Sequence, residues 1–292
     1  MADYFDPNNT GSYNQQNSQY PQYPQYQSNP NGQYQDPQQQ MYQQQMYQQQ
    51  MSRGAFGMNQ PQYAPGQAYG GAVATDVNDV LTKSFLFMFL ALLVTGIVSL
   101  IVANSPSLIL SFYGNPALII IVAVAEIGVV IGATYAMKHN NLTLSAVLFG
   151  VYSILNGLTL SVIFLVYQLG SIVQVFFIAA AIFAAMAIIG ATTKKDLSNL
   201  GMICIIGLFG IIIASIVNWF LKSPGMDYVI SIIGVVVFTG LTAYDVQKIK
   251  KMAATNVGYN PMVLGLYGAM ELYLDFINLF LYLLRILGKA KN

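Results

Sequence analysis

The sequence predicts an all-α membrane protein with seven transmembrane helices, preceded by a disordered N-terminal tail. Only 8% of its 292 residues are charged and 55% are hydrophobic. A soluble domain has about 25% charged residues, so this deficit indicates a membrane protein. The hydrophobic residues are also unevenly placed: they are rare before residue 73 and nearly continuous after Lys83.

The N-terminal region is built of Gln, Tyr, Pro, Asn and Gly, with short repeats at 20–26 and 41–51. It has almost no aliphatic side chains to bury, so burial cannot offset the entropy cost of ordering it. We predict that residues 1–75 form a disordered Gln/Tyr/Pro-rich tail and that residues 76–292 form the transmembrane domain. A passive extension is the expected role of the tail, and self-association is the alternative.

Seven segments of the second region have the length of about 20 apolar residues that a membrane crossing needs. The connections between them are short, and the stretch Asn104–Asn115 is the longest early loop. The expected spans are about 84–103, 116–137, 143–167, 171–192, 200–221, 228–248 and 264–287.

The distribution of basic residues predicts the orientation of the spans. With a cytoplasmic N-terminus, the inner side receives Arg53, Lys83, Lys138, Lys194, Lys195, Lys248, Lys250 and Lys251. The outer side then receives Lys222, Arg285, Lys289 and Lys291. This bias favours a cytoplasmic N-terminus and an extracytoplasmic C-terminus. A re-entrant last segment would instead return the C-terminus to the cytoplasm. The polar N-terminus lacks the pattern of a cleavable signal peptide, so the first span is expected to act as its own insertion signal.

The last span carries polar side chains at membrane depth, where each ionisable group costs about 2.5–3.5 kcal/mol on insertion scales. Glu271, Asp275, Asn278, Tyr282 and Arg285 fall on one stripe of a helix with 3.6 residues per turn. The remaining positions are mostly Leu, Ile and Phe. This helix therefore has an inward face, and the function is expected there.

Two further acids lie in spans: Glu126 in the second and Asp245 in the sixth, where Thr242 shares a helix face with Asp245. Four acids with very few buried bases cannot all be charged in a dry interior, and two close carboxyls titrate as a pair. The residues predict a proton-sensitive cluster within the membrane.

Each of these positions also has a structural alternative. Asp245 can lie at the membrane surface beside Lys248, and Glu126 can serve as a hydrogen-bonding group. Arg285 near a helix end is typical of a snorkelling anchor. The side-chain amide of Asn278 can form a hydrogen bond between helices.

Composition argues against several other classes of function. The single cysteine, Cys204, and the single histidine, His139, exclude an intramolecular disulfide and Cys- or His-rich metal sites. The sequence lacks HExxH, GxSxG and phosphate-loop motifs. We therefore expect no enzyme activity. A net charge of +1 gives no indication of a nucleic-acid partner.

Four segments, in order along the chain, resemble the Bax inhibitor-1 family of transmembrane Bax-inhibitor-motif proteins. Phe238–Lys250 (FTGLTAYDVQKIK) and Leu272–Leu287 (LYLDFINLFLYLLRIL) carry most of the resemblance, and Asn156–Ser161 and Thr192–Ser198 also fit. The resemblance covers about residues 80–290. It implies a bundle in which the last helix is central among the other six.

The resemblance further implies a proton-regulated calcium leak whose pH sensor is an aspartate pair, which maps onto Asp245 and Asp275. Two carboxylates would bind calcium only transiently, because calcium prefers six to eight oxygen ligands. Calcium is then the permeant ion, and no tightly bound cofactor is expected. Some members have a basic latch, for which Lys138 is the nearest candidate here. Glu271 remains an alternative partner for Asp245.

We therefore expect a pH-sensitive calcium leak channel, with Glu126 and Glu271 as secondary acids on the path. The alternative is a non-enzymatic modulator of a membrane-bound protease or of another membrane complex. The expected location is a bacterial cell membrane, and the expected contacts are lipid, calcium and protons.

Overall fold

The computed structural model describes residues 76–255 and 259–291, and within them the chain is all-helical. The strand-like pairing in this part of the chain is one isolated bridge between Tyr167 and Ala290. The predicted tail, residues 1–75, lies outside the described residues. The helices are α2 (Val77–Ala103), α3 (Pro106–Tyr113), α4 (Pro116–Lys138), α5 (Leu142–Leu160), α6 (Val162–Val166), α7 (Leu169–Thr192), α8 (Ser198–Leu221), α9 (Pro224–Thr255) and α10 (Pro261–Leu287).

Side-chain caps explain where several of these helices begin. The carboxylate of Asp76 accepts a hydrogen bond from the second residue of α2. The side-chain oxygens of Asn115, Asn141 and Asn260 do the same for backbone amides of α4, α5 and α10. Each cap satisfies an amide that has no partner in the first helical turn. Pro116 and Pro261 follow their caps directly, at the position where a missing N–H does no harm.

Six helical segments of the described residues are long and apolar enough to cross a membrane. They are Val77–Ala103, Pro116–Lys138, Leu142–Val166, Leu169–Thr192, Ser198–Leu221 and Pro224–Thr255. They match the first six predicted spans in order. The seventh predicted span lies in α10, an unbroken helix of 27 residues that is buried along most of its length.

Two expectations differ from the structure. Residues 106–113 form α3 where a loop was expected, because Pro106 starts a helical turn that carries Phe112 into a buried position. The span predicted at 143–167 is confirmed as Leu142–Val166, and within it the helix is divided at Ser161 into α5 and α6. The sixth span is much longer than 228–248, since α9 runs from Pro224 to Thr255.

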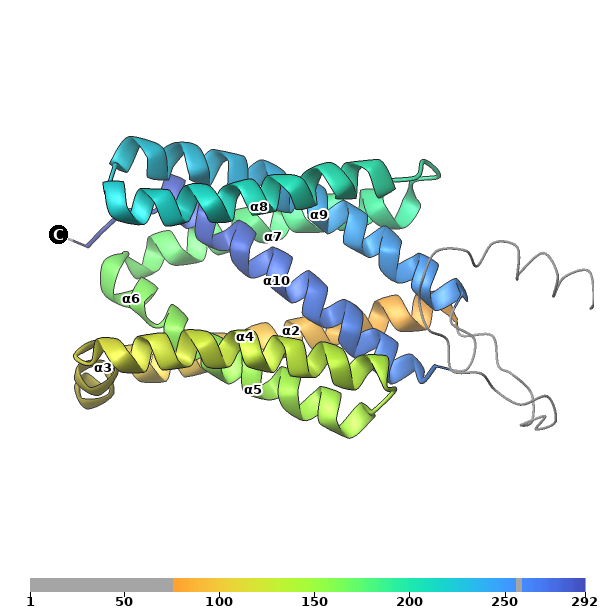
Figure 1. Ribbon diagram of the computed structural model, residues 1–292, viewed down its shortest axis with the longest axis horizontal. Coiled ribbons are helices and arrows are strands. Elements are labelled where there is room, and N and C mark those ends of the chain that lie inside the picture. Colours follow the sequence, from red (N-terminus) through yellow and green to blue (C-terminus); the bar gives the residue numbers. More distant parts are fainter. Residues whose placement is uncertain (1–75, 256–258, 292) are drawn as a thin grey trace, which may run out of the picture. The chain divides into compact units, whose positions relative to one another are not determined.

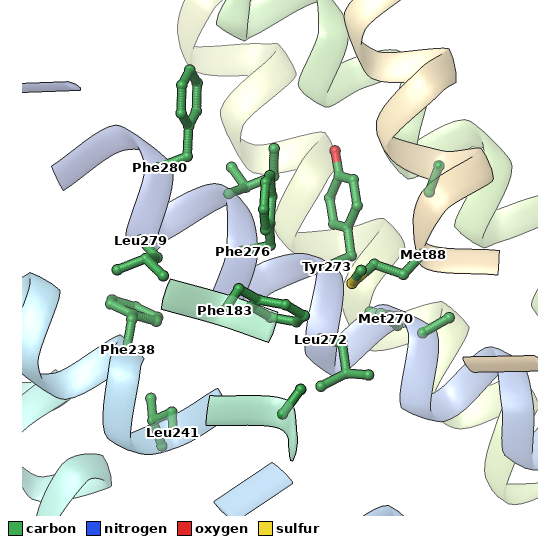
Figure 2. Packing of buried hydrophobic residues seen from close by; sticks show 14 of the residues in the cluster. Met88, Phe183, Phe238, Leu241, Met270, Leu272, Tyr273, Phe276, Leu279 and Phe280 are labelled. Atoms are coloured by element: carbon green, nitrogen blue, oxygen red, sulfur yellow. The ribbon is translucent and has the colours of Figure 1, made fainter. Parts of the chain in front are cut away.

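Helix α10 packs against α2, α4, α5, α7 and α9. In Figure 1 it runs obliquely between the group of α7, α8 and α9 and the group of α2, α4 and α5. Its Leu272, Tyr273 and Leu279 side chains are completely buried. Figure 2 shows Phe276 of α10 beside Phe183 of α7, among the buried side chains. The rings of Phe176 and Phe183 meet that of Phe276 edge to face, with centroids 5.3 and 5.5 Å from it.

Hydrogen bonds also tie α10 to the opposite side of the bundle. The hydroxyl groups of Thr95 in α2 and Tyr273 in α10 lie 2.7 Å apart. Thr95 also donates to the backbone carbonyl of Ser153 in α5, at 3.0 Å. Three helices are thereby joined at one buried point, where unpaired polar groups would be costly.

Glycines allow the closest helix approaches. A Cβ on Gly190 of α7 would meet the backbone carbonyl of Ala243 in α9, and one on Gly234 of α9 would lie 2.6 Å from the ring of Tyr282 in α10. Small residues at such crossings let helix backbones pack directly. The resulting contacts fix α9 between α7 and α10.

Replacing Gly190 by alanine is expected to lower the free energy of unfolding by about 1–3 kcal/mol, the usual cost of overpacking a core. The carbonyl that the new methyl group meets belongs to a helix backbone and cannot rotate away. Thermal unfolding of the purified protein in detergent measures the change. Gly128→Ala is the matched control, because no atom lies within 4 Å of its added Cβ. Equal effects of the two substitutions would contradict this account of the crossing.

Candidate functional site

Asp245 of α9 and Asp275 of α10 lie beside each other in the interior, close enough for their carboxyl groups to share a proton in a hydrogen bond. The residues are 9% and 3% exposed. Asp275 is fourteen residues into the 27-residue helix α10, about 21 Å from its start at 1.5 Å per residue. The pair is therefore close to the middle of this helix. Asp245 is buried rather than solvated, and the ion pair of Lys248 is with Glu271 rather than with Asp245.

The second oxygen of Asp275, Oδ2, is buried and has no hydrogen-bond partner in the described part of the chain. A buried unpaired carboxylate oxygen costs free energy unless the group is protonated or meets a cation. The geometry therefore provides a place where a proton or a metal cation would find an unsatisfied acceptor.

Glu271 lies one helical turn from Asp275 and forms an ion pair with Lys248, which lies about one turn from Asp245. The Lys248 Nζ and Glu271 Oε1 atoms are 2.5 Å apart, and the ammonium group also lies over the ring of Tyr267, 5.5 Å from its centroid. Glu271 thus pairs with Lys248 rather than with Asp245. The sequence offered one signal for Lys248: it shares a helix face with Asp245.

The other half of the polar stripe points toward the C-terminal end of α10. The amide of Asn278 donates to the carbonyl of Leu274 in its own helix, at 2.8 Å. The Tyr282 ring stacks on Phe238 of α9, with centroids 5.8 Å apart. The Arg285 guanidinium lies over the same Tyr282 ring, 5.6 Å from its centroid. Aromatic packing therefore fills the stripe between the aspartates and Arg285.

The remaining predicted site residues lie away from the pair. Thr242 is fully buried, but its hydroxyl donates to the carbonyl of Phe238 in its own helix and not to Asp245. Lys138 is exposed at the end of α4 and forms no ion pair among the described residues. The structure brings neither residue to the aspartate pair as a partner.

Glu126 accepts a hydrogen bond from Thr159 of α5, at 3.0 Å. This hydrogen bond joins α4 to α5. Among the described residues, Glu126 forms no ion pair, and its side-chain hydrogen bond goes to α5 rather than to the aspartate pair.

Within the described ranges, no three His, Cys, Asp or Glu side chains come close enough together to hold a metal ion. The pair alone supplies at most four carboxylate oxygens, fewer than the six to eight that calcium prefers. A cation at this position would keep much of its hydration or pass through quickly.

Comparison with known proteins identifies the family of this chain. A family model described as inhibitor of apoptosis-promoting Bax1 matches residues 77–292. The chain belongs to the Bax inhibitor-1 family. The inner membrane protein YbhL of Escherichia coli strain K12 is 41% identical over 214 residues, which cover 72% of this chain and 92% of YbhL.

Two further relatives are similar over the same fraction of the chain. An uncharacterized protein of Borreliella burgdorferi is 41% identical over 220 residues, covering 74% of this chain and 94% of that protein. An uncharacterized protein of Rickettsia prowazekii is 40% identical over 217 residues, covering 73% and 90%. Together with the apolar helices, these relatives identify this Bax inhibitor-1 family member as a multi-pass membrane protein.

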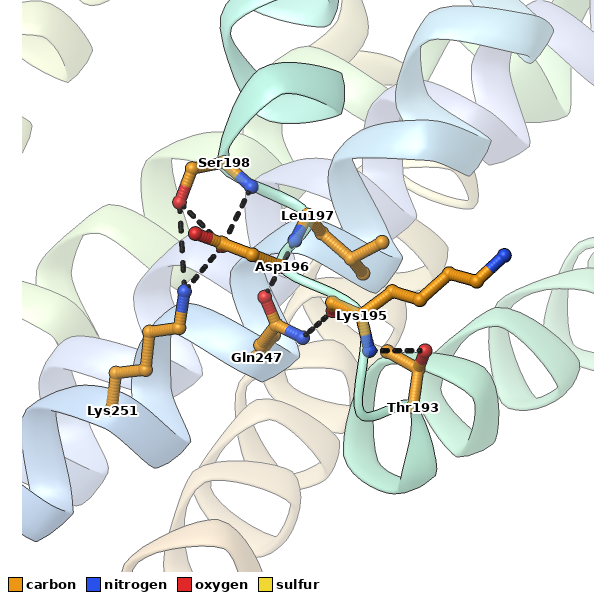
Figure 3. A network of polar contacts seen from close by, with 7 residues as sticks. All are labelled: Thr193, Lys195, Asp196, Leu197, Ser198, Gln247 and Lys251. Carbon is orange, nitrogen blue, oxygen red and sulfur yellow. Dashed lines mark hydrogen bonds and ion pairs between the residues drawn. The ribbon is translucent and has the colours of Figure 1, made fainter.

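A polar network that sequence reasoning missed joins α9 to the link between α7 and α8 (Figure 3). The amide side chain of Gln247 accepts from the backbone N–H of Leu197 and donates to the carbonyl of Lys195, both at 2.8 Å. Asp196 accepts from Lys251 at 2.6 Å and from the Ser198 hydroxyl at 2.7 Å. Gln247 is two residues from Asp245, so this network fixes the helix that carries the aspartate.

The pKa of Asp196 provides a test of this network. The hydrogen bond from Lys251, with those from Ser198, lowers the pKa of the Asp196 carboxyl to about 2. A lowered pKa in the folded state means that the contact is present at neutral pH and is lost only as pH falls through about 2. Acidification through the usual carboxyl range should therefore leave the Asp196–Lys251 contact intact.

Carbon-13 NMR of labelled aspartate, with Asp196→Asn to assign the signal, measures this titration. Lys251→Met removes the hydrogen bond that Lys251 donates to Asp196. The titration midpoint of Asp196 should then move toward the ordinary value for aspartate, about 3.9. A midpoint near that value in the unaltered protein would show that the contact does not form in solution.

Proposed function

We propose that this protein is a pH-sensitive calcium leak channel of the bacterial cell membrane, gated by protonation of the Asp245–Asp275 pair. The observation that carries the proposal is the meeting of these two carboxyl groups, buried between α9 and α10 near the middle of α10. Ionisable groups at membrane depth are costly, and they typically mark an ion or proton path.

The proposal includes seven crossings, with α10 as the seventh and central one. At its start, the backbone N–H of Asn260 donates to Asn140 in the α4–α5 turn, at 3.0 Å. Past its other end, the Lys289 carbonyl accepts from Gln168 at the start of α7, at 2.9 Å. Helix α10 thus connects the same two ends of the bundle as α5. With the basic residues inside, the N-terminus is cytoplasmic and the C-terminus is extracytoplasmic.

Protonation would control the path by changing the charge of the pair. When one proton is shared, the carboxyl groups hold α9 and α10 together. When both are ionised, two charges about 4 Å apart repel by about 4 kcal/mol at an effective dielectric constant of 20. This repulsion favours separation of the helices or entry of a cation. Calcium flux should therefore rise as pH rises. The change in charge of the aspartate pair is the whole of the proposed mechanism.

The Lys248–Glu271 ion pair would act as an internal counterion on the cytoplasmic side of the aspartates. Its ammonium group occupies the position that a permeating cation would next take along the stripe. The two side chains are partly buried, at 32% and 20% exposed, and the second carboxylate oxygen of Glu271 is buried with no hydrogen-bond partner in the described part of the chain. Glu271 is the secondary acid of this path. Glu126 accepts a hydrogen bond from Thr159 of α5 and is assigned this structural role.

Asp275→Asn and Asp245→Asn should each remove most of the pH dependence of calcium flux into proteoliposomes. Asparagine keeps the size and hydrogen bonding of the side chain but cannot ionise. The measurement is calcium-dye fluorescence inside the vesicles over an acid-to-neutral pH series. Asp79→Asn, which alters the exposed ion pair with Lys83, is the matched control and should keep the wild-type profile. A wild-type protein that passes no calcium at any pH would exclude the channel.

Lys248→Met should increase calcium flux at neutral pH, because it removes the ammonium group that competes with the cation. Glu271→Gln should reduce flux, since Lys248 then remains without its closest counterion and repels cations more strongly. The same vesicle assay measures both substitutions. If both variants change flux in the same direction, the loss of packing explains the result and the counterion role is wrong.

A further inference from the structure

A pocket separate from the aspartate pair opens at the end of the bundle that holds the chain's C-terminus. It has a volume of about 480 Å³ and is lined by Tyr167, Pro224, Asp227, Tyr228, Ser231 and Arg285. These residues come from the α6–α7 link, the first two turns of α9 and the last turn of α10. The pocket is thus built where three parts of the fold come together.

The C-terminal segment holds Tyr167, which lines this pocket, in place. After α10 ends, the carbonyl of Lys289 accepts from Gln168 and the N–H of Lys291 donates to the carbonyl of Val166, at 2.9 and 2.8 Å. The ring of Tyr167 packs against Gly288, where an added Cβ would lie 2.7 Å from the ring. These contacts fix Tyr167 beside the last turn of α10, which carries Arg285.

Asp227 is held in place from α8. The buried side chain of Asn218 donates to the Asp227 carboxylate at 2.7 Å, and its own oxygen accepts from the backbone N–H of Ser223 at 3.1 Å. The hydroxyl of Ser231 donates to the backbone carbonyl of Asp227, also at 2.7 Å. The carboxylate is therefore positioned by an amide side chain, and no cationic side chain among the described residues forms an ion pair with it.

Arg285 supplies the opposite charge in the same pocket. Among the described residues, no carboxylate lies within 4.0 Å of its guanidinium, including that of Asp227. The Arg285 guanidinium lies over the Tyr282 ring, 5.6 Å from its centroid. The pocket thus presents a cation and an anion that do not pair with each other.

A zwitterionic ligand matches this arrangement. A phosphate would accept two parallel hydrogen bonds from the guanidinium, and an ammonium group would donate to Asp227. The surroundings favour a lipid as the source. Trp219 and Phe220 at the end of α8 are 74% and 72% exposed, and Tyr228 on the pocket wall is 54% exposed. Exposed aromatic side chains at helix ends are typical of the membrane interface, where headgroups lie.

We propose that this pocket binds the phosphoethanolamine headgroup of a zwitterionic phospholipid, with Arg285 on the phosphate and Asp227 on the ammonium group. Choline carries no N–H and cannot donate to the carboxylate, and phosphatidylglycerol has no cation for Asp227. The pocket should therefore select phosphatidylethanolamine over phosphatidylcholine and phosphatidylglycerol with the same acyl chains.

Native mass spectrometry of the full-length protein in detergent, with the three lipids in equal amounts, tests this selection. Phosphatidylethanolamine should be the preferred adduct. In Arg285→Gln and Asp227→Asn the preference should fall by about tenfold, the change expected when one hydrogen bond to a charged group is lost. Asparagine at 227 can still accept from Asn218, so folding should persist, as thermal unfolding would verify.

Lys289→Ala is the matched control. It removes a positive charge one turn beyond Arg285 at an exposed position that does not line the pocket, and it should keep the wild-type preference. Equal binding of the three lipids, or a preference that both pocket variants retain, would overturn the proposal. Water-soluble glycerophosphoethanolamine is the second probe. If it displaces the lipid at equal concentration, the ligand is a soluble zwitterion and the lipid assignment is wrong.

Discussion

The contact between Asp245 and Asp275 constrains the rest of the bundle. Neither carboxyl group can face lipid, and both are buried between α9 and α10, Asp275 near the middle of α10 and Asp245 ten residues before the end of α9. The two helices must therefore stay in one register, because sliding by a turn would separate the carboxyls and bury each one alone. The Lys248–Glu271 pair and the Tyr282–Phe238 stack lie on either side of the aspartates and hold the same register.

Close packing makes that register possible. Gly234 admits the ring of Tyr282, and Gly190 lets α7 approach the backbone of α9 at Ala243. Lipid chains are as apolar as leucine, so hydrophobic burial gives little drive for helices to associate within a membrane. The positions of glycine, rather than the amount of hydrophobic surface, then decide which helices lie against α9. The Gln247 network adds a polar restraint at the end of the same helix.

The polar stripe of α10 separates into parts with different chemistry. Glu271 and Asp275 face charged partners on α9, whereas Asn278 satisfies its amide within its own helix. Arg285 leaves the interior and enters a pocket that also contains Asp227. One face of a single helix thus contributes to an aspartate pair, to an ion pair and to a separate charged pocket, because each position meets a different neighbouring element.

The sequence by itself determined the helical class, the first six spans in order, and the face of the last helix that carries its polar groups. Composition and the 3.6-residue repeat are local properties, and they are sufficient for these predictions. Only the tertiary structure decided which groups meet. It paired Glu271 with Lys248, placed Glu126 against α5, and formed α3 where a loop was expected. Lys248 and Glu271 are 23 positions apart in the sequence, and Glu126 and its partner Thr159 are 33 positions apart. Such contacts depend on how one helix is rotated and shifted against another, which helix periodicity does not specify.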